Sequence, residues 1–140
     1  MENTIHHSET VQAPLQKVWE HLLYKIDHPE NFVPGVSNVK ILEKSADATL
    51  RKMDLTMPVG TNSVTEKITA TPYCVRFQII EHPLVKGYVE NYAKALNEHS
   101  TLLTYVMNWE FRENRQTANN SDLLKSAVIK SKNYIEGIHL

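Results

Sequence analysis

Residues 13–43 read APLQKVWEHLLYKIDHPENFVPGVSNVKILE, and this stretch decides the fold. Its first half predicts an amphipathic helix, because apolar side chains recur at the three- to four-residue spacing of a single helical face. Pro14 suits the first turn of such a helix. The apolar face consists of Leu15, Val18, Trp19, Leu22, Leu23 and Ile26.

The second half of the stretch is a turn that leads into a strand. His28-Pro29 and Val33-Pro34 end the helix, since proline disfavours helical conformation in the residue before it. Gly35 then permits a sharp change of direction into a strand at residues 36–43. A helix, a broken turn and a strand in this order indicate a fold that closes around a cavity.

Length and composition indicate one domain that spans residues 1–140. The 140 residues are 41% hydrophobic, which is enough for one sizeable core. A net charge of −1 argues against a nucleic-acid partner. The sequence has no apolar run of the roughly 18 residues needed to span a membrane, and its first residues do not resemble a secretion signal. We therefore expect a soluble, cytoplasmic protein without a membrane span.

Most of the remaining chain reads as a succession of strands joined by tight turns, followed by one long helix. This order predicts an α+β fold with a curved antiparallel sheet of about seven strands. Asn120 or Ser121 caps the final helix, predicted for residues 121–137. Its apolar stripe comprises Leu124, Ala127, Val128, Ser131, Ile135 and Ile138. The predicted strands are residues 4–12, 36–43, 49–57, 62–70, 74–81, 87–96 and 101–111.

The order of the predicted elements and the stretch at residues 13–43 resemble those of the START-related, or SRPBCC, helix-grip superfamily, and within it the AtaL-like branch. The most specific part is PENFVPGV at residues 29–36, and GYVENYA at 87–93 and TYVMNWEF at 104–111 match by pattern. The resemblance covers nearly the whole chain. It implies a strand, two helices, six further strands and a long C-terminal helix that the sheet grips around an apolar cavity. Members of the superfamily bind lipids, sterols, polyketides or hormones, and some are aromatase/cyclases.

Two charged residues interrupt the apolar faces of neighbouring predicted strands. Glu66 lies among Val64, Ile68 and Ala70, where an unpaired carboxylate is costly to bury, and Arg51 holds the matching position in the preceding strand. Together they are candidates for a ligand anchor or an acid/base pair. The alternative is a salt bridge at the rim of the sheet or at a position open to water.

Several other side chains are candidates for the wall of the cavity. Tyr105 and Trp109 share one face of the last strand with Met107, which offers apolar surface and two polar tips. Asn91 contributes an amide if its side of the strand faces inward, as Ala93 weakly favours. Ordinary core packing is the alternative for the aromatic stripe. The remaining wall candidates are Met53, Leu55 and Phe77.

The turn after the first helix is a candidate entrance. Phe32, Val33 and Val36 are its apolar side chains, and we identify them as candidate gate residues. A fixed corner of the core is the alternative for residues of this kind.

We predict neither a metal site nor a cofactor. The seven histidines show no ligand spacing of a known metal motif, and His21 and His28 are expected to be solvated or capping residues. Cys74 is the only cysteine, which excludes an intrachain disulfide, and it is expected to be a small, partly buried hydrophobe.

The leading functional hypothesis is binding or carrying of a small hydrophobic molecule, such as a lipid, a sterol or a polyketide-like compound. An enzyme of the cyclase/aromatase or hydrolase kind is the first alternative, in which Arg51 and Glu66 polarise a carbonyl substrate. The second alternative is a protein-interaction module with a filled pocket. Either a monomer or a homodimer is compatible with the sequence.

Overall fold

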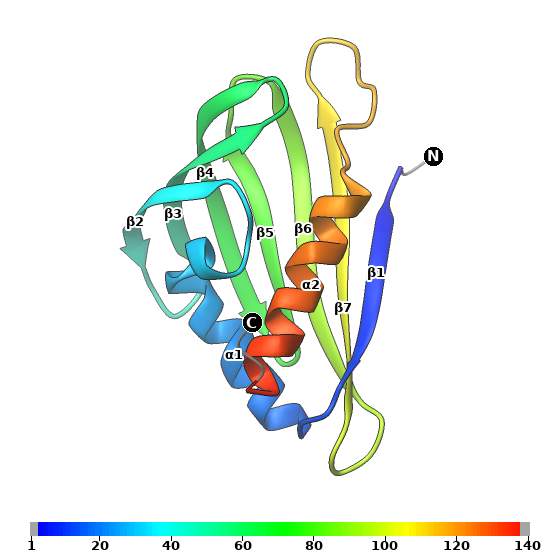
Figure 1. The fold of residues 1–140 in the computed structure, drawn as a ribbon. Coiled ribbons are helices and arrows are strands. Elements are labelled where there is room, and N and C mark those ends of the chain that lie inside the picture. The colour runs from blue at the N-terminus through cyan, green and yellow to red at the C-terminus, as the bar shows by residue number, and fades with distance from the viewer. Residues whose placement is uncertain (1–2, 138–140) are drawn as a thin grey trace.

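A computed structural model describes residues 3–137 of the chain. Seven antiparallel strands form one sheet in the order β1-β7-β6-β5-β4-β3-β2 (Figure 1). The helices are α1 (Leu15–Asp27), the short 3₁₀ helix η1 (Pro29–Asn31) and α2 (Ser121–Ile135). The strands are β1 (Ile5–Val11), β2 (Val36–Lys44), β3 (Thr49–Met57), β4 (Gly60–Thr71), β5 (Cys74–Glu81), β6 (Val85–Ala95) and β7 (Thr101–Phe111).

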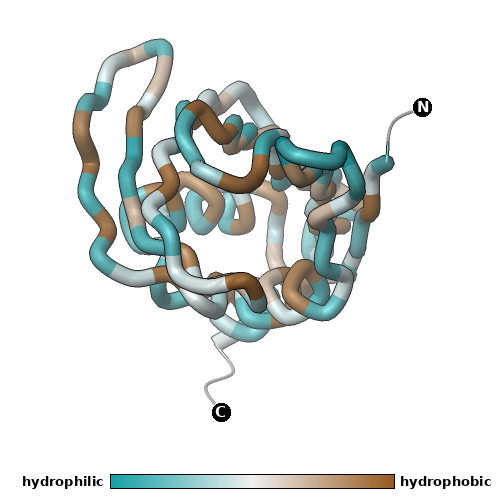
Figure 2. The backbone as a smooth tube through the Cα atoms, turned by 90° about the horizontal axis from the view of Figure 1, so that it is seen from above, coloured by the Kyte–Doolittle hydropathy of each residue, from teal (hydrophilic) through white to brown (hydrophobic). Residues whose placement is uncertain are grey.

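The sheet curves around α2, which packs against β1 and β7, while α1 lies below it against β6 and β7 (Figure 1). Seen from above, the backbone closes into a ring (Figure 2). The predicted α+β helix-grip architecture is therefore confirmed. The second helix implied by the resemblance is a single 3₁₀ turn, because Pro29 begins it and Pro34 follows soon after.

Helix α1 buries a different face from the one that the apolar pattern predicted. Pro14 occupies the N-cap position, at the predicted start of the helix. Leu23 is 39% exposed, so its assignment to the buried face was wrong. His21 and Lys25 are buried instead. Each directly precedes a buried apolar residue, Leu22 or Ile26, on the same side of the helix. The buried face thus carries two ionisable side chains.

Helix α2 begins as predicted. The side-chain oxygen of Asn120 accepts a hydrogen bond of 3.0 Å from the backbone N–H of Leu123, which satisfies one of the free donors of the first turn. Of the predicted stripe, Leu124, Ala127, Val128, Ser131 and Ile135 are buried. Ile138 lies outside the described residues.

Alternation along the strands places the predicted wall residues on the concave face. Arg51 pairs directly with Glu66 across β3 and β4, and Asn91 pairs with Tyr105 across β6 and β7. Asn91 is completely buried, whereas the adjacent Tyr92 is 40% exposed. The open question of which side of β6 faces inward is therefore settled in favour of Asn91.

Gly87 permits the close approach of β6 to β7 beside Trp109, its register partner. Its φ angle is +126°, and a Cβ atom at this position would lie 1.8 Å from the backbone oxygen of Asn108. Backbone atoms of a paired strand cannot move aside cheaply. Gly60 has nearly the same φ angle, +125°, but a Cβ there would meet nothing within 4 Å.

We predict that Gly87→Ala lowers the free energy of unfolding by about 3 kcal/mol or more, since backbone strain and a clash act together. Gly60→Ala is the matched control, with an expected loss of about 1–2 kcal/mol from backbone strain alone. Urea denaturation followed by circular dichroism measures both. Equal losses in the two variants would contradict the packing assigned to Gly87.

Candidate functional site

An inner pocket of about 80 Å³ lies between the concave face of the sheet and the helices. All nine predicted wall residues line it: Arg51, Met53, Leu55, Glu66, Phe77, Asn91, Tyr105, Met107 and Trp109. Helix α1 adds Lys25, and α2 adds Leu123, Leu124 and Ala127. Most of this wall is apolar, and its charged side chains come from α1, β3 and β4.

An outer chamber of about 330 Å³ adjoins the inner pocket. Met107, Trp109 and Leu123 line both spaces. The outer chamber also contacts the loop before β2, the turn between β3 and β4, and the loop before α2.

The structure separates the three candidate gate residues. Val33 and Val36 line the inner pocket, whereas Phe32 does not. Phe32 is buried against the rings of His21 and Tyr134, with centroid distances of 4.8 Å and 5.0 Å. This edge-on aromatic packing gives Phe32 the role of a fixed corner between η1, α1 and α2.

Arg51 and Glu66 form the predicted pair, with 2.7 Å between Arg51 Nη2 and Glu66 Oε1. Arg51 Nη1 also donates a hydrogen bond of 2.8 Å to the backbone oxygen of Ile26. The two residues are only 3% and 4% exposed, so the alternative of a rim or solvent-open position is wrong. The pair joins β3 and β4 and holds the last turn of α1 against the sheet.

Lys25 is the main site residue that the sequence interpretation missed. It is 4% exposed, and its Nζ donates hydrogen bonds to Asn91 Oδ1 and, over 3.2 Å, to Tyr105 Oη. The same nitrogen also lies 4.3 Å from the centre of the Tyr105 ring. Burial, reinforced by the nearby Arg51 charge and opposed by Glu66, lowers the pKa of Lys25 to about 7.

A chain of hydrogen bonds continues from Lys25 into the helix interface. Tyr105 Oη lies 2.7 Å from Ser131 Oγ, which lies 2.9 Å from His21 Nε2. Burial, together with the Lys25 charge, lowers the pKa of His21 to about 3, and burial raises the pKa of Tyr105. His21 and Tyr105 are therefore neutral near pH 7. The expectation that His21 is solvated or capping was wrong.

A sequence signal for both missed residues exists in α1. Positions 18, 21, 22, 25 and 26 follow the spacing of one helical face, so His21 and Lys25 belong beside Val18, Leu22 and Ile26. An interpretation based on apolar residue types alone passes over them.

Three buried N–H groups on the pocket wall have no hydrogen-bond partner within residues 3–137: Arg51 Nε, Asn91 Nδ2 and Trp109 Nε1. Each is a donor only, and an unpaired buried donor is costly. The wall is therefore suited to a guest that supplies a hydrogen-bond acceptor.

Other classes of site find little support in the described part of the chain. Residues 3–137 contain no cluster of three or more His, Cys, Asp or Glu side chains placed to hold a metal ion. Cys74 is half-buried, and burial raises the pKa of its thiol, which disfavours the nucleophilic thiolate. None of the described helices is long and apolar enough for a membrane span.

We predict that Lys25→Met changes the pH dependence of stability. The lowered pKa means that the unfolded wild-type chain binds more protons than the folded one between about pH 7 and pH 10.5. Wild-type stability therefore gains up to about 1.4 kcal/mol per pH unit across this window from Lys25, and the variant lacks this gain.

The measurement is the free energy of unfolding of both proteins at several pH values, with Lys17→Met as the control for removing an exposed lysine of the same helix. Relative to wild type, Lys25→Met is expected to be most stable at pH 7 and to lose this advantage toward pH 10. Parallel pH profiles for wild type and Lys25→Met would contradict the burial of an amine with a lowered pKa.

Comparison with solved structures identifies the same fold in several proteins. The Zhui aromatase/cyclase from Streptomyces sp. R1128 matches with a TM-score of 0.76 and 19% identity, over 98% of this chain and 93% of that one. Norcoclaurine synthase from Thalictrum flavum, in complex with dopamine and hydroxybenzaldehyde, gives 0.76 and 13%, over 100% and 90%. A START superfamily protein from Mycobacterium smegmatis gives 0.69 and 13%, over 96% and 94%.

No curated protein sequence matches the chain. The model of one protein family, described as acetylaranotin biosynthesis cluster protein L, or AtaL, matches residues 6–136. This match spans all seven strands and both α-helices except the first residue of β1. The chain has the fold of these solved structures and belongs to the AtaL family.

Proposed function

We propose that the protein binds a small, mostly apolar molecule that carries a hydrogen-bond acceptor, and that this molecule occupies the inner pocket. The single observation that carries the proposal is the presence of three unpaired donors on a mostly apolar wall. A carbonyl, hydroxyl or ether oxygen satisfies such donors, whereas a pure hydrocarbon leaves them unpaired.

The wall favours an aromatic guest. Phe77, Tyr105 and Trp109 supply three aromatic side chains, and Met107 and Met53 supply adaptable thioethers between them. Aromatic rings gain from packing against both kinds of side chain.

The size of the two spaces limits the guest. Pockets that hold drug-sized ligands usually measure roughly 300–1,000 Å³, and the inner pocket measures about 80 Å³. It therefore suits one ring or a short chain. A sterol, a lipid or a polyketide of several rings must extend past Met107, Trp109 and Leu123 into the outer chamber of about 330 Å³.

An aromatase/cyclase-like enzyme is the second candidate, favoured by the buried Arg51–Glu66 pair beside the pocket and by the fold shared with the Zhui aromatase/cyclase. Replacing both charges together, as in Arg51→Met with Glu66→Leu, avoids leaving one of them unpaired. Turnover of an aromatic polyketide that survives this double change would count against the mechanism. The third hypothesis, a module with a filled pocket, gains no support, since one water needs only about 10–15 Å³ and the inner pocket measures about 80 Å³.

We predict that the protein binds benzyl alcohol more tightly than ethylbenzene, by about fivefold, because the two molecules have similar shapes and only the alcohol offers an oxygen to the unpaired donors. The factor corresponds to a net hydrogen-bond contribution of about 1 kcal/mol. Proton–nitrogen NMR titration measures both affinities.

The same spectra locate the guest. The chain has two tryptophans, and Trp109 lines the inner pocket whereas Trp19 does not. Benzyl alcohol is expected to shift the indole N–H signal of Trp109 and to leave that of Trp19 in place, with Trp19→Phe to assign the signals. Equal affinities for the two molecules, or no shift at Trp109, would count against the proposal.

A further inference from the structure

Lys25 places a primary amine on the wall of the inner pocket. Its Nζ lies 5.2 Å from the centre of the Phe77 ring, and the guanidinium carbon of Arg51 lies the same distance from that ring. The amine thus shares an apolar surface with a fixed cation. Burial in an apolar pocket and an adjacent cation are the two conditions that turn a lysine into a nucleophile at neutral pH.

The hydrogen bonds of Lys25 fit a neutral amine. Nζ donates to Asn91 Oδ1 and to Tyr105 Oη, which are its two hydrogen-bond acceptors among the described residues. A neutral amine has two N–H groups, so both are satisfied and the third position carries the lone pair. An ammonium group would carry a third, unpaired N–H at this position.

The surrounding charges also favour the neutral form. The titratable groups around the amine are Arg51 from β3, Glu66 from β4, Tyr105 from β7 and His21 from its own helix. Arg51 opposes a second positive charge, and Glu66 is already paired with Arg51. Since the pKa of Lys25 is about 7, roughly half of the amine is neutral at pH 7.

We propose that the Lys25 amine forms a reversible imine with an aldehyde or ketone that enters the inner pocket. This inference rests on the proposed function, because it requires the pocket to admit a small carbonyl compound. It adds a covalent chemistry to the binding of the guest and assigns the substrate class, a carbonyl compound with an apolar or aromatic body.

Imine formation needs no oxidant or reductant. The lone pair of Nζ attacks the carbonyl carbon, and the π electrons of the C=O bond move to the oxygen. The nitrogen then gives up both of its hydrogens as the carbonyl oxygen leaves in one molecule of water, and a C=N bond remains. The unpaired N–H groups of Arg51 and Asn91 are available to the oxygen while it carries negative charge.

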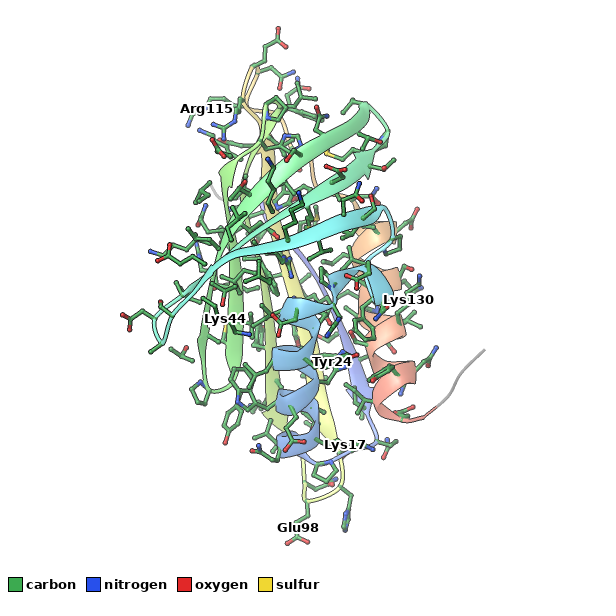
Figure 3. All side chains as sticks on the ribbon, turned by 90° about the vertical axis from the view of Figure 1, so that its left-hand side faces the viewer. Lys17, Tyr24, Lys44, Glu98, Arg115 and Lys130 are labelled. Carbon is green, nitrogen blue, oxygen red and sulfur yellow. The ribbon has the colours of Figure 1, made fainter. Side chains whose placement is uncertain are left out.

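Reductive trapping tests this step on the intact protein. Benzaldehyde is the probe, and sodium cyanoborohydride reduces its imine to a stable benzyl amine that peptide mass spectrometry locates. At pH 7 we expect Lys25 to be labelled at least about tenfold faster than Lys17, which projects at the lower end of α1 in Figure 3 and is exposed. Water stabilises the ammonium form of an exposed lysine, and this form has no lone pair with which to attack a carbonyl carbon.

Variants and a competitor provide the controls. The peptide that contains position 25 is expected to carry no benzyl adduct in Lys25→Met and to keep the adduct in Lys17→Met. Benzyl alcohol, which has the same carbon skeleton and no carbonyl group, is expected to slow the labelling of Lys25 and leave that of Lys17 unchanged. Labelling of Lys25 in wild type is expected to reach half of its maximum rate near pH 7.

The outcomes separate the two proposals, and all of the decisive ones come from the wild-type protein. Benzyl alcohol that binds at Trp109 while Lys25 is labelled no faster than Lys17 would overturn the imine and leave the proposed function intact. Absence of both binding and labelling would overturn both. Labelling of Lys25 that benzyl alcohol does not slow would also overturn the inference, because the reaction would then occur outside the pocket.

Discussion

The buried amine of Lys25 is the constraint that connects the helices to the sheet. A lysine at this depth needs partners, and Asn91 and Tyr105 supply them from β6 and β7. Tyr105 then depends on Ser131 of α2, and Ser131 on His21 of α1. One chain of hydrogen bonds therefore fixes the position of both α-helices relative to neighbouring strands. The helix-grip arrangement is thus specified by hydrogen bonds as well as by apolar contact.

The same chain of hydrogen bonds determines which part of the pocket wall is polar. Its polar groups gather where α1 meets the sheet, whereas Met53, Leu55 and Met107 form an apolar wall elsewhere. The Arg51–Glu66 pair is largely satisfied within the protein, so its charges shape the electrostatics around Lys25 and leave mainly neutral donors for a guest. A molecule with one polar end and an apolar body complements this division.

Features that depend on the local sequence pattern could be predicted from the sequence, whereas features that depend on contacts between distant segments could not. Strand alternation and the turn at Pro29 depend on local pattern, so the sheet and nine wall residues were predicted from the residues and the family resemblance. Leu23 was assigned to the wrong face of α1 and Lys25 was missed, because the prediction used residue type and gave too little weight to position along the helix. Asn91 pairs with Tyr105, and Phe32 packs edge-on against its neighbours, only because segments far apart in the sequence come together in the fold. No local pattern contains this information. The pKa of Lys25 depends on partners from several elements.

The ionisation of Lys25 tests the buried chain of hydrogen bonds most directly. With ¹³C-labelled lysine, the Cε signal of each side chain reports its own titration, and Lys25→Met assigns the signal of interest. A buried amine with a lowered pKa gives a Lys25 signal that titrates near pH 7. A Lys25 signal that titrates near the ordinary value of about 10.4 would show a solvated ammonium group, and it would contradict both the buried polar chain and the chemistry inferred from it.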